Sequence, residues 1–250
     1  MSAVVPLIEA RDLSKRFGGI VAVQNREFAV ARGELVGLIG PNGSGKTTTL
    51  NVLNGIYKAT SGRILFDDAD ITAMSPHQRA GFGIGRTFQN IRLFASMSVV
   101  ENVMVGAQRA NNPVGTSRAA LHERAMSALN FVGMAEQMHM TVKGLPYGHQ
   151  RLVEIARALA GHPSFLLLDE PAAGLNMTEK KNLGKLLTRL KGHGMTIFLI
   201  EHDISLIEQV SDTITVLNFG KKIAEGEPGY VMRHPEVVAA YLGESADATA

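Results

Sequence analysis

One glycine-rich stretch constrains this chain more than any other part of it. Residues 40–47 read Gly-Pro-Asn-Gly-Ser-Gly-Lys-Thr and fit the pattern G-x-x-x-x-G-K-[ST]. The apolar run Leu35–Ile39 comes before the stretch and Leu50 and Leu53 follow at helical spacing, so we expect a strand, a tight loop and a helix in that order. Glycines allow the loop to turn backbone N–H groups inward, and the start of a helix adds further donors. The stretch therefore predicts a binding site for a polyphosphate.

Individual residues of this stretch have separate expected tasks. Lys46 is expected to reach the β- and γ-phosphates of a nucleoside triphosphate, and the hydroxyl of Thr47 to ligate Mg²⁺. A chance glycine-rich turn is the alternative, which the strand before the loop and the helix after it disfavour. The residues expected to hold the nucleotide are Gly40, Pro41, Asn42, Gly43, Ser44, Gly45, Lys46, Thr47 and Thr48.

Composition narrows the class of protein. A chain of 250 residues with 45% hydrophobic and 19% charged residues is ordinary for a globular protein of one sizeable domain. The net charge of +2 comes from scattered lysines and arginines, which argues against nucleic acid as a partner. The chain has no cysteine, which excludes disulfides and thiolate metal sites and suits the cytoplasm. It shows no signal segment and no apolar run of the roughly 18 residues that cross a bilayer, so any work at a membrane would need another chain to span it.

Hydrophobic periodicity predicts an α/β core with a β-rich beginning and an inserted helical lobe. Residues 7–36 carry short β patterns, residues 98–160 read as helical, and residues 165–168 and 195–200 read as buried strands. Residues 81–94 have little periodicity and are expected to be mostly loop. The remaining expected features are a strand at 62–67, helix caps at Asn176 and Asp203, a hairpin of 213–217 with 222–224, and a terminal helix at 235–242 followed by a frayed end.

Two acidic residues end one of the expected buried strands. Asp169 and Glu170 follow the apolar residues 166–168, and ligands of parallel sheets bind at the carboxyl ends of strands. Asp169 is expected to hold Mg²⁺ directly or through water, and Glu170 to orient and deprotonate an attacking water molecule. Two solvated acids at a strand end are the alternative, which the nearby glycine-rich stretch disfavours.

Three further candidates are weaker when each is taken alone. His202 follows the strand expected at 195–200 and could donate a hydrogen bond to the γ-phosphate, although a lone histidine is more often a surface or core residue. The amide of Gln89 could contact Mg²⁺ or the attacking water. Gly148 belongs to a turn that opens the helix carrying Leu152, Ile155 and Leu159, which gives a second helix N-terminus for an anion.

Together and in this order, these residues resemble the ATPase subunits of ABC transporters. The resemblance covers residues 7–243 and rests on the motifs at 40–47, Gln89, 145–150 with 155–159, 166–170 and His202. It implies an ABC ATPase domain over residues 5–243, with ATP and Mg²⁺ as ligands. The implied parts are a P-loop core with a mixed sheet and an antiparallel β subdomain (7–88 and 162–227), a helical lobe (89–161), a C-terminal helix (228–243) and a disordered tail (244–250).

The same resemblance implies that two such chains face each other head to tail. The helix end at Gly148 of one subunit would then close on the ATP that the glycine-rich loop of the other subunit holds. By resemblance Phe17 stacks on the adenine ring, and plain core packing of Phe17 is the alternative. The catalytic residues implied are Lys46, Gln89, Glu170 and His202, and the Mg²⁺ ligands are Thr47, Gln89 and Asp169.

Two departures from the family pattern affect the contact between subunits. The family signature is usually Leu-Ser-Gly-Gly-Gln, and here Pro146 replaces the serine and Tyr147 the first glycine. A serine hydrogen bond to a charged phosphate would contribute roughly 1.5–3 kcal/mol, so its absence matters, although the Gly148 amide and the helix dipole remain. Asn176 stands where the family usually has aspartate, which puts the contact across the dimer at that position in doubt.

Within the family, the chain resembles the ATPase subunits of branched-chain amino-acid importers. This resemblance rests on residues 85–94, 97–102, 171–176 and 234–243. It implies a peripheral protein of the cytoplasmic membrane face, with a second ATPase chain, transmembrane permease subunits and, indirectly, a substrate-binding protein as partners. The segment from Asn90 to Met97 would contact the permease. Its apolar residues Ile91, Leu93, Phe94 and Met97 suit either that contact or packing inside the lobe.

Other functions remain to be separated from this one. Related ATPases serve urea or amide import or lipopolysaccharide export, and this chain does not touch the cargo. A soluble ABC ATPase is disfavoured because the span from Lys46 to Gly148 leaves no room for a long coiled coil. A small-molecule kinase would have no use for the Gly148 helix or His202, and a module that binds nucleotide without hydrolysis would have no use for Glu170.

Overall fold

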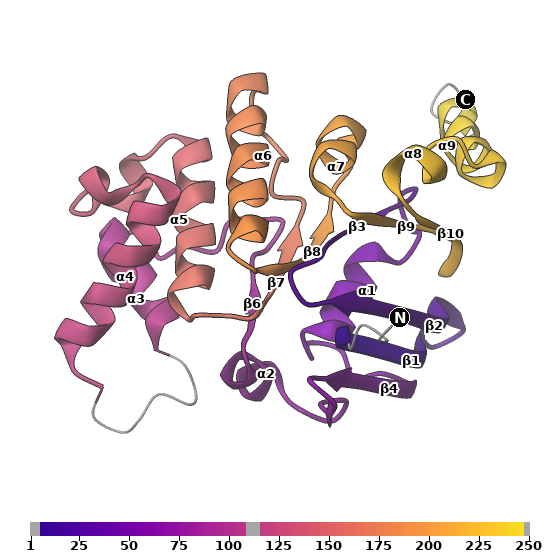
Figure 1. The fold of residues 1–250 in the computed structure, drawn as a ribbon, viewed down its shortest axis with the longest axis horizontal. Helices are drawn as coiled ribbons and strands as arrows, with labels where there is room; N and C mark the ends of the chain where they lie inside the picture. Colours follow the sequence, from indigo (N-terminus) through magenta and orange to yellow (C-terminus); the bar gives the residue numbers. More distant parts are fainter. Residues whose placement is uncertain (1–5, 109–115, 248–250) are drawn as a thin grey trace.

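A six-stranded sheet forms the centre of the molecule. The computed structural model describes residues 6–108 and 116–247. In this sheet the strands follow the order β10-β9-β3-β8-β7-β6, and all neighbours are parallel except the hairpin of β9 with β10 (Figure 1). Every residue of β3, β7 and β8 is buried, as expected of apolar strands that are covered on both faces. The six strands are β3 (Leu35–Ile39), β6 (Ile84–Arg86), β7 (Phe165–Asp169), β8 (Thr196–Ile200), β9 (Thr213–Asn218) and β10 (Lys221–Gly226).

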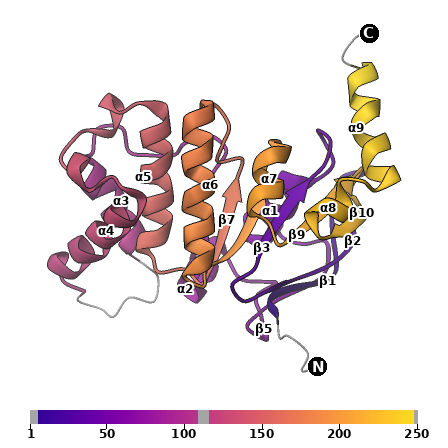
Figure 2. The same cartoon turned by 45° about the horizontal axis from the view of Figure 1, so that its top comes forward.

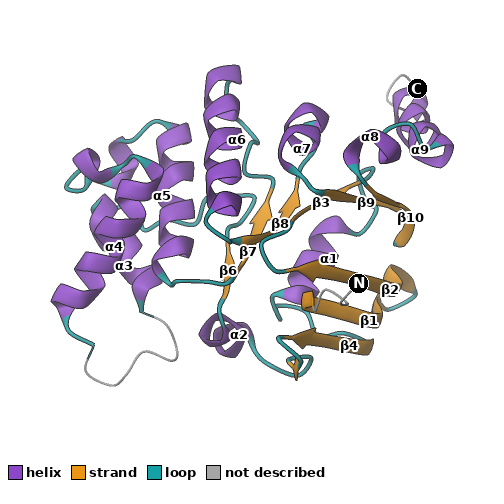
Figure 3. Cartoon of the chain, in the orientation of Figure 1, coloured by secondary structure: helices purple, strands orange, loops and turns teal. Residues whose placement is uncertain are grey.

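A second, antiparallel sheet lies against the first across a single helix (Figure 3). Helix α1 (Lys46–Leu53) lies between the two sheets, and Leu50 and Leu53 are fully buried there. Phe28 from the second sheet stacks on Phe198 of β8, with ring centroids 5.6 Å apart. This shared core fixes α1, and therefore the glycine-rich loop before it, relative to both sheets. The second sheet has the order β2-β1-β4-β5, with β1 (Pro6–Phe17), β2 (Ile20–Ala31), β4 (Ser61–Phe66) and β5 (Ala69–Asp70).

The helical lobe lies at one end of the six-stranded sheet (Figure 2). It contains α3 (Val99–Ala107), α4 (Arg118–Val132) and α5 (Tyr147–Ala160). One continuous apolar cluster joins this lobe to α6 (Met177–Gly192) and α7 (Ile204–Val210), the helices that cover one face of the sheet. The lobe therefore packs directly on the core. The part of the expected lobe at 109–115 lies outside the described residues.

Residues 81–94 are mostly loop, as expected, but the segment also contains two short elements that the sequence did not predict. Helix α2 (Pro76–Phe82) runs into this segment, and β6 follows it. Ser75 caps α2 through a capping box with Gln78, and proline occupies the first helical position. Helix α2 is too short to show a hydrophobic periodicity, so the cap residues are its only signal in the sequence. The three residues of β6 are strand because they pair with β7.

The C-terminal region is more helical than expected. Helix α8 (Pro228–Val231) precedes α9 (Pro235–Asp247), which continues beyond the expected end at Leu242 and projects from the body of the molecule (Figure 2). Ala246 favours helix, and the acidic residues nearby do not prevent it. The expected fraying from Glu244 is therefore wrong as far as Asp247, and residues 248–250 lie outside the described part. Within residues 6–108 and 116–247, no helix has the length and apolar character required to span a membrane.

Candidate active site

The glycine-rich loop connects β3 to α1 and is packed against other backbone segments. Gly45 has φ 99°, and a Cβ atom there would lie 2.2 Å from the carbonyl oxygen of Ala22. Gly40 has φ 145°, and a Cβ atom there would lie 2.1 Å from the carbonyl oxygen of Leu217. Any side chain at either position would collide with β2 or β9, so the close packing and the left-handed backbone both require glycine.

Helix α1 begins directly at the loop and presents a positive end. Gly45 is its N-cap, and no side chain caps the first turn. The buried Lys46 ammonium donates hydrogen bonds to the carbonyl oxygens of Gly40 and Pro41, at 2.7 and 2.9 Å. The helix dipole, the first N–H groups and the lysine charge therefore converge at one place, which is the electrostatic requirement for a polyphosphate site.

Gln89, Glu170 and His202 meet at the carboxyl ends of three neighbouring strands. The two oxygens of Glu170 contact Gln89 Nε2 and His202 Nε2, each at 2.9 Å. Because β6, β7 and β8 are adjacent and parallel, residues that directly follow them are brought to the same edge of the sheet. Glu170 has φ 48°, a strained conformation for a non-glycine residue, and its N–H donates to the Ile200 carbonyl. The neighbouring strand thus holds this carboxylate in place.

A cavity of about 290 Å³ joins these three residues to the glycine-rich loop. Its lining contains most of the residues expected to hold the nucleotide and all four expected catalytic residues. They are Ala22, Asn42, Gly43, Ser44, Gly45, Lys46, Thr47, Thr48, Gln89, Glu170 and His202. The tertiary structure therefore brings together segments that are far apart in the sequence, while their individual roles stay predictions.

Asp169 is the buried last residue of β7 and directly precedes Glu170 in the chain. Its Oδ2 atom is 3.4 Å from Arg86 Nη2, and its Oδ1 atom is buried without a hydrogen-bond partner. Burial raises the pKa of Asp169, and the nearby Arg86 guanidinium opposes that rise. A buried carboxylate oxygen without a partner is a position that a cation could satisfy.

The donor set fits Mg²⁺ that is bound together with phosphates. The expected ligands are the Thr47 hydroxyl, the Gln89 amide oxygen and Asp169, all of them hard oxygen donors. Among the described residues no group of three or more histidine, cysteine, aspartate and glutamate side chains could hold a metal ion. A divalent cation here would therefore complete its coordination with water and phosphate oxygens, as Mg²⁺ commonly does.

Phe17 and Gly148 lie outside the cavity. Phe17 is 42% exposed at the end of β1, with its ring nearly perpendicular to that of Tyr57 and Lys15 Nζ 4.7 Å from its centroid. Core packing of Phe17 is thus excluded, and adenine stacking stays a prediction. Gly148 lies in the first turn of α5, where a Cβ atom would come within 2.3 Å of the Glu179 carboxylate on α6. Contact of Gly148 with a nucleotide would need a second subunit.

The residues that depart from the family pattern lie at the starts of two helices. Pro146 is the N-cap of α5, and no side chain caps that helix. The Tyr147 hydroxyl lies 3.2 Å from Arg151 Nη2. Asn176 caps α6, where its Oδ1 accepts hydrogen bonds from the Thr178 and Glu179 N–H groups at 3.0 Å each. Aspartate would cap this helix in the same way, so asparagine conserves the local structure.

Sequence reasoning missed four buried charged residues around the site. Glu201 is 3% exposed and accepts hydrogen bonds from the N–H groups of Ala172 and His202, and burial raises its pKa. Its position directly before His202 was an available signal. The other three are Arg86, which contacts Asp169, and the pair Arg151 and Glu154 on α5. Nothing in the apolar pattern of α5 indicated that these charges are buried.

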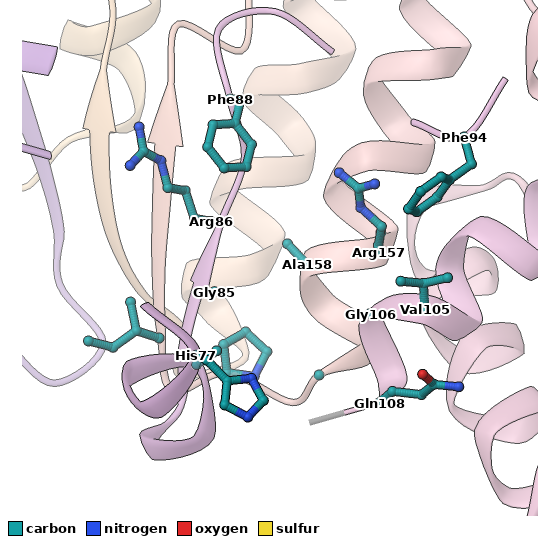
Figure 4. A pocket seen from close by; sticks show the side chains of 14 residues that line it. His77, Gly85, Arg86, Phe88, Phe94, Val105, Gly106, Gln108, Arg157 and Ala158 are labelled. Atoms are coloured by element: carbon teal, nitrogen blue, oxygen red, sulfur yellow. The ribbon is translucent and has the colours of Figure 1, made fainter. Parts of the chain in front are cut away.

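A hollow of about 340 Å³ lies between α2, β6, α3 and α5 (Figure 4). Phe94, Phe88 and Arg157 are among its lining residues. Phe94 is 51% exposed, whereas Leu93 packs against the core of the lobe. Packing inside the lobe therefore holds for Leu93, whereas contact of the exposed Phe94 with a permease stays a prediction.

The fold and the cavity at the glycine-rich loop define a P-loop nucleoside triphosphatase with an inserted helical lobe. This is the architecture of an ATP-binding cassette. Sequence comparison agrees with this class. The family model described as "ABC transporter" matches residues 23–173, and one described as "Branched-chain amino acid ATP-binding cassette transporter" matches residues 221–247. This chain belongs to the ABC transporter family, as an ATP-hydrolysing subunit that is coupled to transport.

Individual relatives support the same assignment. The chain is 42% identical to the high-affinity branched-chain amino acid transport ATP-binding protein LivG of Escherichia coli (strain K12), over 96% of this chain and 99% of that protein. A nucleotide-free ATP-binding cassette from an ABC transporter superposes with a TM-score of 0.87 at 30% identity, over 95% and 99% of the two chains. A dimeric bacterial ABC transporter cassette gives a TM-score of 0.80 at 26% identity, over 88% and 98%. The predicted fold and the predicted family are confirmed.

Proposed function

We propose that the transport powered by this chain is the uptake of branched-chain amino acids through separate membrane subunits. The family match at residues 221–247 and the names of the relatives support this cargo. The observation that carries the catalytic part of the proposal is the convergence of Glu170, Gln89 and His202 on the cavity of the glycine-rich loop.

The geometry suggests a task for each residue. Lys46 and the N-terminus of α1 bind the β- and γ-phosphates of ATP, and Phe17 offers an exposed ring to the adenine. Glu170 accepts a proton from the attacking water, while Gln89 and His202, now on its two oxygens, hold the water and the γ-phosphate. Thr47, Gln89 and Asp169 would hold Mg²⁺, which would supply positive charge to neutralise the phosphates.

Hydrolysis in this proposal needs a second ATPase subunit. ABC ATPase cassettes form dimers and work with transmembrane permease subunits. In a head-to-tail dimer, the first turn of α5 with Gly148 would place backbone N–H groups and a helix dipole near the γ-phosphate of the partner's ATP. The subunit would be peripheral, at the cytoplasmic face of the cell membrane, and a substrate-binding protein would act on the other side.

Reconstitution tests the cargo. Proteoliposomes that contain this chain with the membrane proteins that co-purify with it should take up labelled leucine only when ATP is present, and should not do so with Glu170→Gln in place of the native chain. Uptake of urea or an amide in place of leucine would contradict the cargo. Leucine uptake that does not depend on ATP would contradict the mechanism.

A further inference from the structure

A buried ion pair on α5 is not used by the mechanism described so far. Arg151 Nη1 lies 2.6 Å from Glu154 Oε2, and the two side chains are 1% and 0% exposed. Both residues belong to the helix whose first turn contains Gly148. Burying two charges is costly unless further hydrogen bonds use their remaining donors and acceptors. The partners of these side chains therefore indicate what the pair does.

Those partners lie in the loop that carries Gln89. Arg151 donates to the carbonyl oxygens of Phe88 and Gln89, both at 2.7 Å. Glu154 Oε1 accepts from the N–H groups of Phe88 at 3.3 Å and Arg92 at 3.5 Å. Residues 88–90 are neither helix nor strand, and side chains of α5 supply hydrogen bonds to the backbone groups of Phe88 and Gln89 that a sheet would otherwise supply.

The same loop is connected to the catalytic carboxylate on one side and to the outer hollow on the other. The Gln89 side-chain amide donates to Glu170 Oε2. Gln89 directly follows Phe88, whose backbone is bound by Arg151 and Glu154. The Phe88 ring and Arg157 line the hollow between core and lobe, and Arg157 also donates to the Arg92 carbonyl oxygen (Figure 4). A shift of α5 would therefore move Gln89 relative to Glu170.

We propose that Arg151 and Glu154 are positioning residues that make Gln89 follow the orientation of α5. They fix the backbone of Phe88 and Gln89, and thereby the direction in which the Gln89 amide reaches Glu170. Gly148 begins the same helix, so docking of that helix end on the partner's ATP is transmitted to the subunit's own catalytic carboxylate. The inference rests on the proposed functions of Gln89 and Gly148.

Charge-conserving and shape-conserving substitutions test this inference. Arg151→Lys keeps the ion pair but cannot donate to both carbonyl oxygens as the planar guanidinium does. Glu154→Gln keeps the shape and removes the charge. We expect each to lower kcat about tenfold and to leave the Kd for ATP within about twofold, because the phosphate site itself is intact. In a Gln89→Ala background the same substitutions should change kcat by less than about twofold, because they act through Gln89.

Arg79→Lys is the matched control for loss of stability. Arg79 is also fully buried and donates to backbone carbonyl oxygens, those of Val52, Leu53, Thr72 and Met74, but it contacts neither Gln89 nor α5. It should lower the unfolding midpoint at least as much as Arg151→Lys while kcat of the folded protein stays near the native value.

Three outcomes would overturn the inference. Equal loss of kcat in the native and Gln89→Ala backgrounds would show that Arg151 does not act through Gln89. If Arg79→Lys lost kcat in proportion to its loss of stability, the effect of the Arg151 and Glu154 variants would be explained by stability alone. A Gln89→Ala variant with native kcat would refute the proposed function of Gln89 as well, which separates that failure from the first.

Discussion

Glu170 is the residue at which the backbone, the neighbouring side chains and the proposed chemistry meet. Its φ of 48° is uncommon for a residue with a Cβ atom, and its two oxygens are shared between Gln89 and His202. Its side chain is largely shielded from solvent, with 12% exposed. An amide at this position could keep the size and one hydrogen bond of the carboxylate, but it could not accept a proton from water.

The first prediction follows from that difference. Glu170→Gln should bind ATP with native affinity and hydrolyse it at least about a hundredfold more slowly, the loss expected when a general base is removed. Binding of a fluorescent ATP analogue and release of inorganic phosphate measure the two effects separately. The control is Lys46→Ala, which should lose binding because the ammonium at the centre of the loop is gone. Near-native turnover by Glu170→Gln would remove Glu170 from its proposed role.

Arg79 shows at the same scale why buried charges escape detection in a sequence. It is 1% exposed, and its donors bind the carbonyl oxygens of Val52 and Leu53 at the end of α1. Burial lowers the pKa of Arg79 to about 10, so the side chain stays charged at neutral pH and complements the negative end of the helix. No apolar pattern reports a cation that is satisfied by backbone oxygens.

At the scale of elements, α7 depends on its cap. Asp203 Oδ1 accepts from the Leu206 N–H, and Asp203 Oδ2 pairs with Lys180 of α6 at 2.8 Å. The Lys180 hydrogen bond lowers the pKa of Asp203 below its ordinary value of 3.8. Because the folded state holds the proton less tightly than the unfolded state, the ionised form stabilises the fold above pH 3.8, and this contribution is lost as the pH falls through the lowered pKa.

A pH-dependent stability difference is therefore expected for Asp203→Asn, which keeps the cap acceptor and loses the charge. At neutral pH it should be less stable than the native chain by up to about 1 kcal/mol, the range of partly exposed ion pairs. The difference should close as the medium is acidified below pH 3.8. Urea unfolding at a series of pH values measures it. A difference that stays constant into acid would show that the charge of Asp203 is not responsible.

The loop after β6 connects the central sheet to the helical lobe through its contacts with α5. This loop has no regular structure of its own, and Arg151 and Glu154 of α5 supply hydrogen bonds to its Phe88 and Gln89 backbone. The same loop continues into the segment with the exposed Phe94, beside the hollow lined by α2, α3 and α5. A permease helix that fills the hollow would contact the element that positions Gln89.

This hollow gives a prediction at the scale of the whole molecule. Phe94→Glu should reduce co-purification of the permease subunits at least about tenfold, because it places a charge in an apolar contact. ATP hydrolysis by the subunit without permease should be unchanged. Tyr230→Glu is the matched control, since Tyr230 is similarly exposed, at 59%, on α8, which does not line the hollow. If Phe94→Glu co-purified the permease subunits as well as the native chain does, the permease would have to contact another surface.

The head-to-tail dimer gives a second prediction at this scale. Since Gly148 does not line the cavity of its own chain, hydrolysis per chain should fall steeply when the protein is diluted below its dimerisation constant. Phosphate release measured across a dilution series, with light scattering at each concentration, tests this. A rate per chain that stays flat while the protein becomes monomeric would contradict a site shared between subunits.

Much of the fold and of the candidate site could be predicted from local patterns. The glycine-rich loop, the buried strands before Asp169 and His202, and the helix caps at Asn176 and Asp203 are each determined by residues that are neighbours in the sequence. Helix α2 and strand β6 were missed because one is a short helix and the other is strand only through its partner β7. Secondary structure that depends on a distant partner carries little local signal.

The sequence by itself determined that a phosphate loop, a pair of strand-end carboxylates and a histidine exist in this chain, because each is written in consecutive residues. Only the tertiary structure decided that Gln89, Glu170 and His202 touch, since the order of β6, β7 and β8 in the sheet sets their distance. It also decided that Arg151 and Glu154 are buried against the Gln89 loop. Whether a charged side chain faces water or a bare backbone depends on packing between segments that are far apart in the chain, and no local pattern encodes that.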